Sequence, residues 1–138
     1  MKTRLFFPCV TLLVCILGFE DIACAQAGRF YSSGNELSNS LINQVFQDST
    51  GFVWVATENG LNRIDGHSLR KYHYIPGDSS SLKNNYVHCV YQDSGGTLWV
   101  GCLNGLQRYL PYTDSFEEIS LNVGDARVFP HIMQILET

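Results

Sequence analysis

The sequence contains one seventeen-residue stretch in two closely similar copies, and this repeat limits the folds open to the chain. QDSTGFVWVATENGLNR starts at Gln47 and QDSGGTLWVGCLNGLQR starts at Gln92, an offset of 45 residues. A gap-free period of this length indicates similar units that stack on one another. The residues that recur as a structural motif are Asp48, Gly51, Trp54, Gly60, Leu61 and Arg63 in the first copy and Asp93, Gly96, Trp99, Gly105, Leu106 and Arg108 in the second.

The same offset holds outside the motif. Five more residues recur, namely Leu37, Asn39, Val45, Gln47 and Ser49, which become Leu82, Asn84, Val90, Gln92 and Ser94. Each copy reads as four short strands, because β-branched and aromatic runs alternate with Gly, Asn, Asp and Ser clusters. We expect the strands at 42–48, 52–57, 61–64 and 69–75 in the first copy, and at 86–92, 97–102, 106–110 and 115–120 in the second.

Four strands in about 45 residues predict an all-β fold made of antiparallel β-propeller blades. A blade cannot bury both of its faces alone, so it needs neighbouring blades. Within each copy, we expect Asp48 to cap a turn through its carboxylate and Gly51 to take a positive φ there. Asn59 and Gly60 form the next tight turn. Trp54 and Trp99 are expected to close one blade against the next.

The first residues predict a secretory signal peptide. Lys2 and Arg4 precede an apolar run from Leu5 to Phe19, and small residues follow in ACAQA. This order of basic, apolar and small residues is typical of an exported chain, with cleavage after Ala25 or Ala27. A membrane anchor is a weaker interpretation because the run is short. A lipoprotein attached at Cys24 is a minor alternative.

These observations divide the chain into five segments. They are a signal peptide over 1–27, a lead-in strand over 28–36, blade repeats over 37–81 and 82–126, and the start of a truncated third repeat over 127–138. Two full copies cannot close a ring. We therefore expect a fragment or the first piece of a longer chain, only marginally stable unless completed.

Composition excludes some classes of function. The formal net charge is −4, and 16% of residues are charged. Such a balance argues against nucleic acid or an anionic membrane surface as the partner. Cys89 and Cys102 follow the signal segment, and an oxidising compartment would allow them to pair. They do not recur between the copies, so two buried free thiols are the favoured expectation.

The repeated phrases resemble the two-component regulator propeller repeat, with its pattern D-s-x-G-x-[LV]-W-[IV]-G-T-x-x-G-L-x-R. The resemblance extends from Phe30 to Thr138, and Ala56, Cys102 and Leu103 depart from the pattern. It implies the N-terminal part of the periplasmic sensor of a hybrid two-component system histidine kinase. In such sensors, propellers precede a membrane helix, a kinase core and a receiver domain, and none of these later parts is in this sequence.

The resemblance implies a ligand-sensing function, with a carbohydrate as ligand. It also implies a homodimer in the full-length sensor, completion by the remaining blades, and a periplasmic ectodomain. The chain itself is expected not to be an enzyme. The alternatives are a part of a secreted propeller enzyme, such as a polysaccharide lyase or hydrolase, and a non-functional remnant.

No catalytic, cofactor or metal site is expected. Asp48 and Asp93 lack the further oxygen ligands of a calcium loop, so turn capping is favoured. Arg63 and Arg108 could bind an anion, but pairing with a neighbouring blade is favoured. The histidines have no metal-ligand spacing. Two loops, Tyr72 to Tyr86 and Tyr109 to Glu118, carry aromatic and polar groups that suit sugars, although such groups also serve packing.

Overall fold

The computed structural model describes residues 37–66, 68–123, 126–128 and 130–138. All of them belong to one of the two units into which the chain divides, Tyr31–Thr138. The expected signal peptide and lead-in strand, 1–36, lie outside the described residues.

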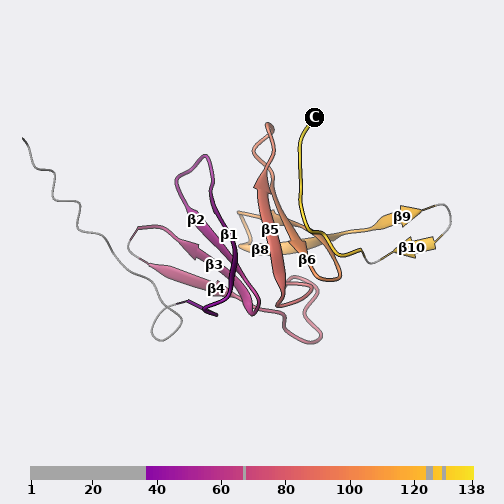
Figure 1. Cartoon of the computed structure of the whole chain (residues 1–138), viewed down its shortest axis with the longest axis horizontal. Helices are drawn as coiled ribbons and strands as arrows, with labels where there is room; N and C mark the ends of the chain where they lie inside the picture. Colours follow the sequence, from indigo (N-terminus) through magenta and orange to yellow (C-terminus); the bar gives the residue numbers. More distant parts are fainter. Residues whose placement is uncertain (1–36, 67, 124–125, 129) are drawn as a thin grey trace, which may run out of the picture. The chain divides into compact units, whose positions relative to one another are not determined.

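The described chain forms two four-stranded antiparallel sheets in simple up-and-down order (Figure 1). The first consists of β1 (Ile42–Gln47), β2 (Val53–Thr57), β3 (Gly60–Ile64) and β4 (Leu69–Tyr72). The second consists of β5 (Val87–Gln92), β6 (Leu98–Cys102), β7 (Gly105–Leu110) and β8 (Ser115–Ile119). This arrangement confirms the predicted all-β fold of four-stranded blades. We call the two sheets blade 1 and blade 2.

The pairing between the first two strands of each blade contains a bulge at the same repeat position. In blade 1, Ile42 pairs with Thr57 but Gln44 pairs with Ala56, so Asn43 is an extra residue. In blade 2, the extra residue is His88, between the pairs Val87–Cys102 and Cys89–Gly101. A bulge re-aims a side chain away from the ladder. The repeat therefore turns Asn43 and His88 out of the ordinary alternation.

A mainly aromatic core joins the two blades. Trp54 is 1% exposed and lies against Tyr72 of its own blade, with ring centroids 6.0 Å apart. It also meets Tyr109 of blade 2 edge-on at 4.9 Å. Phe116 packs on Tyr72 at 5.2 Å. Large buried rings in edge-to-face contact are a strong packing term, so Trp54 closes blade 1 against blade 2.

A short hairpin follows blade 2 and was not predicted. Its strands are β9 (Leu121–Val123) and β10 (Ala126–Val128), which pair only with each other among the described residues. The equivalent stretch of the first copy, 76–83, forms a loop instead. LNVGDARV alternates around Gly-Asp, which is a hairpin pattern, and could have revealed it.

The beginning of the third copy lies along blade 2 without forming a strand. The N–H of Ile132 donates to the carbonyl of Cys102 at 3.3 Å. The Sγ of Cys89 lies 3.6 Å from the carbonyl oxygen of Ile132. This close approach needs Gly101, because a Cβ there would lie 2.7 Å from Cγ2 of Ile132.

Candidate functional site

The carboxylate of Asp48 organises the turn between β1 and β2. Its Oδ1 accepts hydrogen bonds from the N–H groups of Thr50 at 2.9 Å and Phe52 at 3.0 Å. Its Oδ2 accepts from Nε1 of Trp54 at 2.7 Å. Gly51 has a φ of 93°, which favours glycine. Partial burial raises the pKa of Asp48, but these hydrogen bonds outweigh burial and the pKa lies below 3.8.

Blade 2 repeats this turn. Oδ1 of Asp93 accepts from the N–H of Thr97 at 2.8 Å, and Oδ2 accepts from Nε1 of Trp99 at 2.8 Å. The hydrogen bond from Trp99 is the largest influence on Asp93 and lowers its pKa. In both blades the carboxylate oxygens already serve protein donors, so the geometry is that of a turn cap.

The two motif tryptophans differ in their surroundings. Trp54 is buried between the blades, whereas Trp99 is only half-buried. Gly60 and Gly105 both have positive φ, at 119° and 156°, in the turns that follow. The motif leucine Leu61 is fully buried in the core, and Leu106 is half-buried.

Arg63 pairs with the neighbouring blade, which is the role favoured from the sequence over binding an anion. Its Nη1 donates to the hydroxyl of Tyr109 and lies 3.2 Å from Oδ1 of Asp114, in the turn between β7 and β8. Its guanidinium also lies over the ring of Phe52, 4.7 Å from the centroid. Arg108 behaves differently, because it pairs with the exposed Glu117 on the adjacent strand.

Asp114 is a hub that sequence reasoning missed. The hydroxyls of Tyr72 and Tyr109 each donate to its Oδ1 at 2.6 Å, and Nε of Arg70 lies 2.6 Å from its Oδ2. Burial raises the pKa of Asp114, but the hydrogen bonds from the two tyrosines and the charges of both arginines outweigh burial. The pKa of Asp114 therefore lies below 3.8. Burial and the bond to Asp114 raise the pKa of Tyr72. Asp114 has no counterpart 45 residues earlier, where Leu69 stands.

Buried amide side chains hold the segment that leads into each blade. Oδ1 of Asn62 accepts from the N–H of Ser38 at 2.9 Å, and Oε1 of Gln107 accepts from the N–H of Lys83 at 2.7 Å. The two contacts are 45 residues apart. An amide residue recurs at this position in both copies, and this recurrence could have revealed the contact from the sequence.

The remaining sequence candidates are structural groups. Cys89 and Cys102 are free and buried, and burial raises the pKa of Cys102 to about 12. His88 stacks near His131, with ring centroids 6.4 Å apart, and its Nε2 is buried without a partner among the described residues. Burial, and then the charge of His131, lower the pKa of His88.

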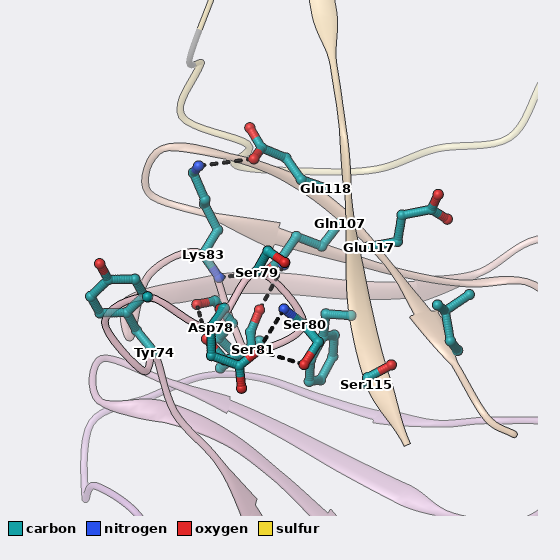
Figure 2. A pocket seen from close by; sticks show the side chains of 14 residues that line it. Tyr74, Asp78, Ser79, Ser80, Ser81, Lys83, Gln107, Ser115, Glu117 and Glu118 are labelled. Atoms are coloured by element: carbon teal, nitrogen blue, oxygen red, sulfur yellow. Dashed lines mark hydrogen bonds and ion pairs between the residues drawn. The ribbon is translucent and has the colours of Figure 1, made fainter. Parts of the chain in front are cut away.

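The two loops singled out from the sequence come together around one cleft of about 610 Å³. The loop Gly77–Lys83 forms one wall and β8 of blade 2 forms the other. Tyr74, which is 46% exposed, stands at one side (Figure 2). At another side, Nζ of Lys83 lies 2.9 Å from Oε2 of Glu118. The cleft thus combines an aromatic ring, serine hydroxyls and charged groups.

Chemically, this arrangement suits binding by hydrogen bonds and ring contacts. Within the described ranges, no three His, Cys, Asp or Glu side chains gather closely enough to hold a metal ion. The described residues form no helix that is long and apolar enough to span a membrane.

Repeated four-stranded blades, each with a turn capped by Asp and a Trp that donates to that Asp, define a propeller-type repeat protein. The repeats are two-component regulator propeller repeats, because the model of that family matches residues 36–59 and 81–104. The protein named Histidine kinase P4 from Formosa agariphila is 44% identical over 45 residues, which are 33% of this chain and 3% of the relative.

Solved structures agree with this assignment. The extracellular domain of BT3049 from B. thetaiotaomicron, assigned as a hybrid two component system, has a TM-score of 0.62 and 29% identity, over 75% of this chain and 15% of that one. The extracellular domain of BT4673 from the same organism has a TM-score of 0.53 and 28% identity, over 64% of this chain and 13% of that one. The chain therefore spans only a small part of its relatives.

Proposed function

We propose that the chain forms the first blades of an exported, ligand-sensing β-propeller in a hybrid two-component sensor. The observation that carries the proposal is the likeness, in fold and in repeat sequence, to extracellular domains assigned to such systems. In this role, the chain is the N-terminal fragment of a periplasmic ectodomain, completed by further blades. The chain itself transfers no phosphate and catalyses no reaction.

A carbohydrate is the ligand class that we propose. The cleft between Gly77–Lys83 and β8 carries serine hydroxyls, the aromatic ring of Tyr74 and the Lys83–Glu118 pair. Hydroxyls and charged groups can bind sugar hydroxyls, and an exposed ring can stack on a sugar face. Binding would signal only if the ligand favours one of two arrangements of the sensor. We propose the homodimer of the full-length sensor as the assembly that changes.

Calorimetric titration of the complete ectodomain with a panel of oligosaccharides tests this proposal. We expect one class of oligosaccharide to bind and to remain intact during the experiment. Turnover of the oligosaccharide would favour the alternative of a secreted propeller enzyme, and failure of every oligosaccharide to bind would contradict a carbohydrate ligand.

Tyr74→Ala shows whether this cleft takes part. We expect it to weaken binding roughly five- to tenfold, since one lost stacking contact is worth about 1–1.5 kcal/mol. Tyr112→Ala is the matched control, because Tyr112 is fully exposed and does not line this cleft. Equal affinities of the two variants would place the ligand elsewhere.

A further inference from the structure

A second cleft adjoins the one between Gly77–Lys83 and β8, which we now call the serine cleft. The second cleft has a volume of about 440 Å³, and we call it the asparagine cleft. It is lined by Tyr74, Lys83, Asn84, Asn85 and Asn104. Tyr74 and Lys83, both at the left of Figure 2, also line the serine cleft. The two clefts therefore share one wall, which carries an exposed aromatic ring.

Two of the asparagines offer hydrogen-bond donors whose orientation is set by the protein. Oδ1 of Asn85 accepts a hydrogen bond from the N–H of Tyr74 at 2.7 Å, and Oδ1 of Asn84 accepts from the N–H of Tyr86 at 2.8 Å. An amide carries two further donors on its nitrogen. Within the described ranges, neither Nδ2 group donates to a protein acceptor. Both NH₂ groups are thus available to a ligand at the wall of the asparagine cleft.

Asn104, in the turn between β6 and β7, has an amide that the fold does not use. Its Oδ1 is buried and accepts no hydrogen bond from any described residue. A buried polar atom without a partner costs free energy, which a donor on a ligand can recover. The terminal torsion of an asparagine side chain is soft, and a half-turn about it exchanges the oxygen and the NH₂ group. Asn104 can therefore present either an acceptor or a donor to the asparagine cleft.

Comparison of the two copies shows that the repeat does not require all of these residues. Lys83 and Asn85 occupy the positions that Ser38 and Ser40 hold in the first copy. Both copies nevertheless form the same four-stranded sheet. The blade fold therefore needs neither the ammonium group of Lys83 nor the amide of Asn85, and contact with a ligand is a role that remains for them.

We propose that the asparagine cleft is a second sugar subsite, and that one oligosaccharide spans both clefts across Tyr74 and Lys83. One sugar unit lies in the serine cleft and the next lies in the asparagine cleft. Hydroxyl oxygens of the second unit accept from Nδ2 of Asn84 and Asn85, and a hydroxyl of that unit donates to Oδ1 of Asn104. Neutral amides suit neutral hydroxyls, because no charge has to be desolvated. The inference rests on the proposed carbohydrate-sensing function and adds that the ligand has at least two sugar units.

A comparison of ligand lengths tests whether both clefts are used. The complete ectodomain is titrated calorimetrically with glucose, mannose, xylose and galactose, and with the β-linked oligosaccharides of each sugar. We expect the affinity to rise roughly tenfold or more from one sugar unit to two, because only the longer ligand fills both clefts. Equal affinities for one and two units would overturn the second subsite and leave carbohydrate binding intact. Binding of no sugar would contradict the proposed function itself, and this inference with it.

Asn104→Ala tests the asparagine cleft directly. The variant should fold normally, because Oδ1 of Asn104 has no hydrogen bond to lose in the described part of the chain. We expect it to bind the disaccharide about fivefold more weakly, as the loss of one hydrogen bond predicts, and the monosaccharide unchanged. Asn59→Ala is the matched control, because Asn59 holds the same turn position in blade 1 and lines neither cleft. Unchanged disaccharide affinity in Asn104→Ala, or an equal loss in Asn59→Ala, would overturn the inference.

Discussion

The backbone N–H of Ser49 donates to the side-chain oxygen Oε1 of Gln92 across 2.7 Å, and this single contact joins the turn of one blade to the inner strand of the next. The other end of the same amide, Nε2, donates to the carbonyl of Gly96 at 3.0 Å. Gln92 therefore holds its own turn and the preceding blade together. An amide side chain can make both contacts because it carries a donor and an acceptor.

Gln92→Ala should lower the free energy of unfolding by about 1–2 kcal/mol, because two hydrogen bonds are lost. Denaturant unfolding followed by tryptophan fluorescence measures the change. Gln47→Ala is the matched control, since among the described residues Gln47 bonds only to its own turn. Equal losses in the two variants would show that the contact between blades contributes nothing.

Asp114→Asn should destabilise the chain by about 2 kcal/mol, because Arg63 and Arg70 lose their charged partner while Tyr72 and Tyr109 stay buried. Glu117→Gln removes the carboxylate of an exposed pair with Arg108 and should cost less than about 0.5 kcal/mol. Urea unfolding of both variants compares them. An Asp114→Asn chain as stable as Glu117→Gln would contradict the role of Asp114 as an inter-blade hub.

The pKa shift of His88 predicts a dependence of stability on pH. Because burial lowers the pKa of His88 in the folded state, the unfolded chain takes up the proton first as the pH falls. Stability is therefore complete above pH 6.5, the ordinary value, and decreases as the pH falls from there toward the folded pKa. Unfolding free energies measured between pH 8 and about 5 should follow this slope.

His88→Asn should flatten that slope. Asn43 holds the same position in blade 1 and donates to the carbonyl of Val87, so asparagine suits the site. His73→Asn is the control, because His73 does not lie at either bulge. If His73→Asn flattened the slope and His88→Asn did not, the assignment to His88 would be wrong.

Gly101→Ala should release the segment that begins the third repeat. A Cβ at this position would lie 2.6 Å from Sγ of Cys89 and 2.9 Å from the carbonyl oxygen of Ile132. We expect the N–H of Ile132 to exchange at least tenfold faster in this variant, because its bond to Cys102 is lost. Ala56→Gly, at the equivalent place in blade 1, should leave this exchange rate unchanged. Slow exchange of Ile132 in Gly101→Ala would contradict the close approach.

The repeat allowed most of the fold to be predicted. The strand expected at 52–57 is β2, Val53–Thr57, because turn-forming residues lie on either side of it, in 49–51 and 58–60. The role expected for Arg63 also agrees with its contacts to blade 2. These features depend on residues close in sequence or on the repeat itself.

Other features could not be read from a repeat. Asp114 stands opposite Leu69 in the alignment of the copies, so nothing marked it, and its partners come together only when the blades pack. The expected strand 69–75 ends at Tyr72, because the N–H groups of Tyr74 and Ile75 donate to side chains of Asn85 and Ser81 instead of to a neighbouring strand. The β9–β10 hairpin replaces a loop of the first copy. In each case the determining contact is specific to one place in the chain.

The most direct test of the account is to determine the reading frame downstream of the codon for Thr138. Thr138 stands 45 residues after Asp93, at the Asp position of the motif. We expect the Gly and Trp of the motif to follow it, then further repeats of about 45 residues, and then a membrane helix and kinase motifs. The assignment to a two-component sensor would be contradicted by a reading frame that ends without another Gly-Trp repeat. A frame that encodes the catalytic residues of a secreted enzyme would also contradict it.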